Sequence, residues 1–268
     1  MRDDSFGQDA PRDRPLHGAP FPPNRLHPRL YFAEFLGTGL LVGTGVSVVI
    51  LMFGQGSPVP EAVPNEALRR FLTGALFGSV AALIAVSRIG RVSGAHINPA
   101  VTLAFWLEGK LAWRDAVSYV LAQLAGGVAG ALPLLMWGRM GRSVAFGVTQ
   151  PGPGVSVWIA LTGEIGATFL LIVTLFTTAA HPRTRNLTPL TLPVLFSVLV
   201  WLEAPISGTS ANPARSLGPA LVAGISTDQW IYILGPLIGA ALAVGLMRLE
   251  TVRLPRVTVA RIFHFHLT

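Results

Sequence analysis

The sequence contains no cysteine and few charged residues, and both absences limit what the protein can be. Without cysteine there is no disulfide framework and no thiolate metal site. Charged residues make up 12% of the chain, about half of the roughly 25% that is typical of soluble domains. Hydrophobic residues make up 51%, and the mean hydropathy is +0.56. This composition predicts a polytopic membrane protein.

Other signatures of chemistry are missing as well. The sequence has no nucleotide-binding loop, no cluster of metal-ligating residues and no recognisable pair of nucleophile and base. We therefore expect no enzyme, no catalytic residue, no cofactor and no bound metal. The net charge of +7 could indicate nucleic-acid binding, but the basic residues lie at the ends of apolar segments. Membrane topology explains them better, so no nucleic-acid partner is expected.

Six apolar segments approach or exceed the ~20 residues that a transmembrane helix needs. They are residues 31–53, 71–87, 113–137, 157–179, 187–204 and 229–249. Most Lys and Arg residues fall in the two tails and around residues 88–91, 110–114 and 183–185. The positive-inside rule then places both termini in the cytoplasm. Residues 1–29 are rich in Pro, Arg and Asp and predict a disordered tail, and residues 250–268 a basic tail.

Two short segments with a common pattern interrupt the series of spans. Residues 93–100 and 207–214 each read Ser-Gly, three residues, then Asn-Pro-Ala. Asn is a favoured N-cap and Pro suits the first helical position, so Asn98 and Asn212 each predict a helix start. The apolar run after each motif is about ten residues long, or ~15 Å, half of the ~30 Å hydrocarbon core. Two such half-helices could span the bilayer by meeting tip to tip at its midplane.

The two halves of the chain repeat each other. Residues 31–137 and 157–249 each contain three spans, with a half-helix between the second and third span. Each half also has one acid near its start, Glu34 and Glu164. Three spans are an odd number, so the two halves have opposite orientations in the membrane. Inverted repeats with broken helices place a solute path at the midplane.

These features together resemble the aquaporin, or major intrinsic protein, family. The resemblance rests on two Asn-Pro-Ala motifs, a Glu in spans one and four, and the Asn-Pro-Ala-Arg-Ser ending of the second motif, over about residues 31–249. It implies an all-α channel domain over residues 30–249 with an aquaporin-like inverted repeat of six transmembrane helices and two re-entrant half-helices. It also implies a homotetramer with one pore in each subunit.

The resemblance gives the motif residues a role at the centre of a pore. Asn98 and Asn212 would offer their side-chain amides to the solute, with Pro99, Ala100, Pro213 and Ala214 completing the motifs. Plain N-capping is the alternative for each Asn, and the two roles can coexist. The N-termini of both half-helices carry partial positive charge, which opposes cations and protons, as is established for aquaporin-type pores.

Three charged residues lie within the predicted membrane segments, and each has two interpretations. Glu34 and Glu164 are expected to accept hydrogen bonds from N–H groups of the re-entrant loops, whose backbone has no helix to satisfy it. The alternative is that they carry protons in a coupled transporter. Arg215, on the first turn of the second half-helix, is expected to donate to solute oxygens and repel cations. Its alternative is a salt bridge to Glu203.

The remaining filter positions are found by counting from the motifs. Water-selective relatives place an aromatic residue twenty residues before the first motif's Asn and a His twelve before the second. Here these counts reach Gly78 and Val200, and a loop position three before the second Asn is Thr209. Gly78, Val200, Thr209 and Arg215 predict a wide filter. Two alternatives stay open: Gly74 and Gly78 could be a helix-packing motif, and a shift of one residue would put Phe77 in the filter.

A widened filter on this scaffold predicts a passive channel for water and small uncharged solutes such as glycerol, urea or undissociated arsenous acid. A water-selective aquaporin is the alternative. A coupled secondary transporter and a closed structural or junctional protein are less favoured. The expected location is the inner membrane of a bacterium.

Overall fold

The computed structural model describes residues 25–249, and the tails at residues 1–24 and 250–268 lie outside this range. All regular secondary structure in residues 25–249 is helical, with no strand in this range. The predicted N-terminal tail therefore falls mostly outside the description. Its boundary was two residues too late, because Pro28 and Arg29 already belong to the first helix.

Six helices of residues 25–249 are long and apolar enough to cross a membrane. Each matches a predicted span to within a few residues at its ends. They are α1 (Pro28–Phe53), α3 (Glu66–Val86), α6 (Trp113–Ala131) with its 3₁₀ extension η1 (Leu132–Trp137), α8 (Val157–Ala180), α9 (Thr188–Ser207) and α11 (Ile231–Arg248).

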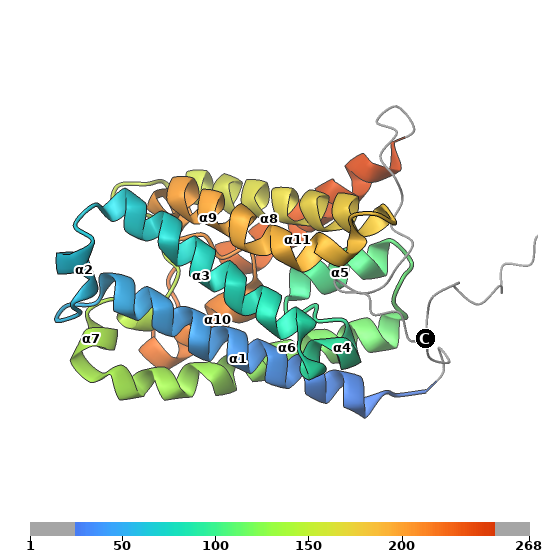
Figure 1. Ribbon diagram of the computed structural model, residues 1–268, viewed down its shortest axis with the longest axis horizontal. Coiled ribbons are helices and arrows are strands. Elements are labelled where there is room, and N and C mark those ends of the chain that lie inside the picture. The colour runs from blue at the N-terminus through green and yellow to red at the C-terminus, as the bar shows by residue number, and fades with distance from the viewer. Residues whose placement is uncertain (1–24, 250–268) are drawn as a thin grey trace, which may run out of the picture.

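The predicted half-helices are present as well, and each begins directly after its motif asparagine. They are α5 (Pro99–Leu107) and α10 (Pro213–Ala223). At 1.5 Å per residue they are ~14 and ~17 Å long, so neither could cross a bilayer without the other. Figure 1 shows both within the bundle of long helices. The remaining short helices are α2 (Val59–Ala62), α4 (Arg88–Ser93), α7 (Gly138–Arg142), η2 (Ala145–Gly147) and η3 (Arg185–Leu187).

The long helices pack in corresponding pairs in the two halves of the chain. In the first half α1 packs along α6, and in the second half α8 packs along α11. Both contacts are close because a glycine faces a carbonyl of the neighbour. A Cβ on Gly126 would lie 2.2 Å from the carbonyl oxygen of Phe35, and a Cβ on Gly239 would lie 2.3 Å from that of Ile165. Small residues at the contact let the backbones approach in this way.

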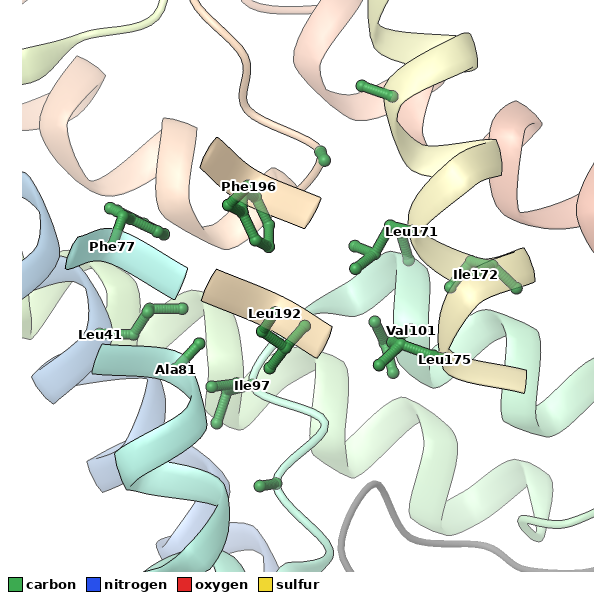
Figure 2. Packing of buried hydrophobic residues seen from close by; sticks show 14 of the residues in the cluster. Leu41, Phe77, Ala81, Ile97, Val101, Leu171, Ile172, Leu175, Leu192 and Phe196 are labelled. Atoms are coloured by element: carbon green, nitrogen blue, oxygen red, sulfur yellow. The ribbon is translucent and has the colours of Figure 1, made fainter. Parts of the chain in front are cut away.

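The two halves meet where α3 packs against α9, which is the most extensive contact between them. Beside this contact a small cavity is lined by two groups of apolar side chains. Figure 2 shows Phe77 of α3 and Phe196 of α9 in one group and Leu171 and Leu175 of α8 in the other. The two phenyl rings lie 6.0 Å apart between centroids. The candidate pore lies in this region.

Candidate pore and selectivity filter

The two half-helices are capped by the same device. The backbone of Asn98 and Asn212 is extended, with φ of −159° and −155°, and a proline follows each at the first helical position. The side-chain Oδ1 of Asn98 accepts from the N–H of Ala100 at 2.9 Å, and that of Asn212 accepts from Ala214 at 3.0 Å. Asn98 and Asn212 therefore cap their half-helices, as the sequence predicted.

The other end of each asparagine amide joins the two halves. Asn98 Nδ2 donates to the carbonyl of Ala211 at 2.8 Å, and Asn212 Nδ2 donates to the carbonyl of Ile97 at 3.0 Å. The tips of the half-helices thus meet through reciprocal hydrogen bonds between segments more than one hundred residues apart in the chain. Each amide nitrogen carries two hydrogens, so this bond leaves one on each side chain for a solute.

The loop before each cap holds strained backbone. Ala95 and Ile97 in the first loop have φ of 55° and 43°, and Thr209 and Ala211 in the second have φ of 51° and 49°. Left-handed backbone is unfavourable for non-glycine residues, above all for β-branched ones, and costs ~1–3 kcal/mol at each position. Such conformations persist where the surroundings fix them, and here a buried carboxylate holds each loop.

Glu34 of α1 holds the first loop. Its Oε1 accepts from the N–H of His96 at 3.0 Å, and its Oε2 accepts from the N–H of Ile97 at 2.6 Å. Gln123 of α6 donates to the same Oε2 at 2.7 Å. The carboxylate is fully buried, and three donors surround it, so its charge is compensated without water.

Glu164 of α8 holds the second loop with the same geometry. Its Oε1 accepts from the N–H of Ser210 at 2.7 Å and its Oε2 from the N–H of Ala211 at 2.8 Å. The hydroxyl of Ser207 donates to Oε1 at 2.6 Å. The two acids therefore have the contacts that the scaffolding interpretation expects, and these contacts give the carboxylates a role that does not require proton transport.

A pair of tyrosines repeats the symmetry of the two halves. The hydroxyl of Tyr119 in α6 donates to the carbonyl of Ser93, and the hydroxyl of Tyr232 in α11 donates to the carbonyl of Ser207, both at 2.7 Å. Each acceptor is the last helical residue before a re-entrant loop. The sequence signal is that each tyrosine follows its motif asparagine by about twenty residues, near the start of the third span in its half.

A small cavity of about 40 Å³ lies against the two caps. Its polar wall includes Asn98, Asn212, His96 and Ser210, and its apolar wall includes Phe77 and side chains of α3, α8 and α9. A water molecule needs roughly 10–15 Å³ of such space, so the cavity suits molecules of that size in single file. Asn98 and Asn212 are both 5% exposed, as expected for groups that line a narrow passage.

Arg215 lies on the first turn of α10, and its side chain reaches a second, wider cavity of about 390 Å³ on the side of Val148, Thr149 and Arg70. One nitrogen, Nη1, donates to the carbonyl of Gly147 at 2.9 Å. Its Cζ lies 5.9 Å from the centroid of the Phe77 ring. A salt bridge to Glu203, the alternative in the sequence analysis, is not among the ion pairs of residues 25–249.

The structure corrects the assignment of Gly78 to the filter. A Cβ on Gly78 would lie 2.5 Å from the carbonyl oxygen of Leu192 and one on Gly74 would lie 2.0 Å from that of Phe196, so both glycines face α9. The neighbouring side chain, Phe77, lines the small cavity and faces Arg215. Its ring rests on Gly45 of α1, where a Cβ would lie 2.6 Å from the ring. Two alternatives that the sequence left open therefore apply. Gly74 and Gly78 pack against α9, and the shift of one residue brings Phe77 to the cavity.

The other two predicted filter residues lie near this point. Val200 of α9 lines the wide cavity together with Gly208 and Arg215. Thr209 is buried, and it is placed between Gly208 of the wide cavity and Ser210 of the small one. Phe77 thus lines the small cavity, and Val200 and Arg215 line the wide one.

Comparison with known proteins gives consistent matches. The family model described as major intrinsic protein matches residues 25–247. Aquaporin AqpM of Methanothermobacter marburgensis is 36% identical over 228 residues, covering 79% of this chain and 92% of that protein. Lens fiber major intrinsic protein of Gallus gallus is 37% identical over 231 residues, covering 82% and 80%. The solved aquaglyceroporin of Plasmodium falciparum shares the fold, with a TM-score of 0.62 at 20% identity, and the match covers 82% of this chain and 94% of that one.

Proposed function

Because the chain belongs to the major intrinsic protein family, whose members are membrane channels and not enzymes, we propose that it conducts water together with uncharged solutes of about the size of glycerol. Flow is passive and follows the concentration gradient. The observation that supports this proposal is that the Arg215 guanidinium lies beside the apolar ring of Phe77. Val200 stands in the chain where water-selective relatives have a His, so we expect it to leave the filter wider.

Exclusion of ions follows from the half-helices. The N-termini of α5 and α10 meet at the small cavity, and each carries roughly half a positive charge. Arg215 adds a full charge a short distance along the passage. A cation entering the cavity would lose its hydration and face the positive ends of both half-helices, whereas an uncharged solute can exchange water for the Nδ2–H groups of Asn98 and Asn212.

Selection among uncharged solutes rests on the two faces of the filter. The guanidinium of Arg215 has five N–H donors, of which one is bound to the carbonyl of Gly147. The remaining donors suit hydroxyl oxygens, while Phe77 and Val200 suit carbon-bound hydrogens. A polyol with hydroxyls along one edge fits both faces. Urea and undissociated arsenous acid offer oxygens but less apolar surface.

One observation favours a water-selective channel as the second candidate. The sequence predicted that Gly78 would leave this side of the filter open, but the ring of Phe77 lines the small cavity instead. The passage is therefore narrower than the sequence indicated. The two candidates differ in whether Val200 leaves enough room beside that ring. Stopped-flow light scattering on proteoliposomes, comparing water, glycerol, urea and arsenous acid, tests them directly. Glycerol flux no faster than through protein-free vesicles would support the water-selective candidate.

Val200→His is expected to convert the channel toward water selectivity. The larger polar ring would close the gap beside Phe77 and lower glycerol permeability about tenfold while leaving water permeability within about twofold, since small steric differences in a fitted site discriminate by 10–200-fold. Val198→His on the same helix is the control, because Val198 is exposed on the outer face. Unchanged glycerol flux in Val200→His would place the narrowest point elsewhere.

We also propose the topology and assembly that the family resemblance implies. Figure 1 shows the start of α1 and the end of α11 at the same end of the bundle, which supports both termini on one side of the membrane. The positive-inside rule assigns that side to the cytoplasm, and we propose the inner membrane of a bacterium as the location. The outer faces of the long helices expose large apolar side chains such as Leu83, Leu121 and Val194. These faces suit lipid and the neighbouring subunits of a homotetramer.

A further inference from the structure

A groove at one end of the bundle combines two arginines with an apolar wall, and the pore does not explain this combination. It lies between the N-terminal end of α1 and α4, with Arg29 and Arg88 at its rim and Phe32, Leu36, Ile89 and Val92 among the residues along its apolar wall. We call it the Arg29–Arg88 groove. Its volume is about 350 Å³, within the range of ligand sites. We infer that it binds an anionic phospholipid, with the phosphate between the two arginines and an acyl chain along the apolar wall.

The charges at the rim point to an anion. Both arginines are exposed, and no carboxylate is among the described residues that line the groove. Arg29 is the second residue of the first span, and Arg88 follows the last residue of α3 by two positions. Both therefore stand at the level of the lipid headgroups, where basic pockets between spans recognise anionic lipids.

The apolar wall points to a lipid rather than to a free anion. Phe32 is 61% exposed and Val92 is 42% exposed, although both border a charged rim. Inorganic phosphate would use the arginines and leave this wall uncovered. The chain's own C-terminal segment does not suit the groove, because it carries Arg253, Arg256 and Arg261 and would be repelled by the rim. A phospholipid of the bilayer supplies the required charge and the required apolar surface in one molecule.

The groove adjoins the elements that hold the first re-entrant loop. Its wall contains Ala33 of α1, the residue before Glu34, and Ile89 of α4. Gly37, one turn further along α1, is the point where Ile97 and Ile89 approach α1, since a Cβ there would lie 2.8 Å and 3.8 Å from their methyl groups. A lipid in the groove would press α4 against α1 and stabilise the loop that ends at Asn98.

The test measures the thermal unfolding midpoint of the full chain in detergent as phosphatidylglycerol is added. We expect an increase of several degrees, because a ligand that binds the native state shifts the unfolding equilibrium. Phosphatidylcholine with the same acyl chains and inorganic phosphate should each give a much smaller increase. The double variant Arg29→Gln/Arg88→Gln should lose at least half of the phosphatidylglycerol effect. Arg139→Gln/Arg142→Gln, which removes two exposed arginines of α7, should keep it.

A second variant separates the lipid from a simple anion. Val92→Trp keeps both arginines and fills the apolar wall, so it should also reduce the phosphatidylglycerol effect. The inference is wrong if inorganic phosphate stabilises as strongly as the lipid, or if Val92→Trp leaves the lipid effect intact. It is equally wrong if both double variants respond alike. Loss of the native oligomer in Arg29→Gln/Arg88→Gln, with the lipid effect unchanged, would instead identify the groove as a contact between subunits.

Discussion

Glu164→Ala is expected to yield a protein that does not keep its folded pore. The substitution removes the acceptor for the N–H groups of Ser210 and Ala211 and for the hydroxyl of Ser207, all of them buried. The two N–H groups are left without an acceptor, whereas the hydroxyl of Ser207 can still donate to the carboxylate of Glu203. Each buried donor left without a partner costs ~1–3 kcal/mol, so the total is on the order of 2–6 kcal/mol. This is a large share of the stability of a typical folded protein, ~5–15 kcal/mol. Glu34→Ala should behave in the same way, because Glu34 also accepts from three donors.

The measurement is the unfolding midpoint in detergent, combined with water permeability of whatever protein reconstitutes. Glu61→Ala is the matched control, because Glu61 is an exposed carboxylate of the short helix α2. Glu164→Gln keeps one acceptor oxygen and should be intermediate. A proton-carrier role predicts a different result, in which Glu164→Gln is as stable as the wild type but does not transport. That outcome would reject the scaffolding role and revive the coupled transporter.

The sequence predicted the parts of this fold that depend on local chemistry. The six spans follow from runs of apolar residues, and the starts of α5 and α10 follow from Asn98-Pro99 and Asn212-Pro213, which are strong helix-start signals. The contacts of Glu34 and Glu164 could also be anticipated, because a re-entrant loop inside a membrane must find acceptors for its N–H groups. Each of these inferences depends on a short segment of sequence and does not require knowing which face of a helix points into the pore.

The error at Gly78 shows where such reasoning stops. Counting back from Asn98 assumes a fixed number of residues between the motif and the filter, but this segment contains the turn at Ser87 and the short helix α4. The count does not detect one additional residue in this segment. Such a residue shifts the assigned position on α3 by one, which is a rotation of about 100° around the helix, since a helix has 3.6 residues per turn. Counting back from Asn212 is less exposed to this error, because α9 leads into its loop with no intervening helix. The filter roles of Val200 and Thr209 stay predictions.

The reciprocal bonds of the asparagines could not be predicted from sequence either. They join Asn98 to Ala211 and Asn212 to Ile97, and their existence depends on the exact distance between the tips of two half-helices. The same holds for the contact of His27 and Tyr31 with Asp115 across α1 and α6, at 2.9 and 2.6 Å. Contacts of this kind follow from the packing of the bundle and leave no local pattern in the chain.

Phe77→Ala is expected to increase glycerol permeability about tenfold or more, while the adjacent Gly78→Ala should leave the ratio of glycerol to water permeability unchanged. The reason is geometric: Phe77 faces Arg215 across the passage, so removing the ring widens the filter by a change of the size that discriminates 10–200-fold in fitted sites. A methyl on Gly78 instead meets the carbonyl of Leu192 at 2.5 Å. It would push α3 from α9 and destabilise the protein by ~1–3 kcal/mol.

Two measurements should therefore distinguish Phe77→Ala from Gly78→Ala. Stopped-flow permeability should change selectivity for Phe77→Ala, and the unfolding midpoint should fall for Gly78→Ala with its selectivity intact. Phe77→Tyr controls for loss of the ring, because it keeps the aromatic wall and should keep the wild-type ratio. If Gly78→Ala lowers glycerol flux without lowering the midpoint, and Phe77→Ala conducts as the wild type does, then Gly78 faces the passage after all. Because one helix cannot present both adjacent residues to the same narrow opening, the pair of results assigns the register of α3 unambiguously.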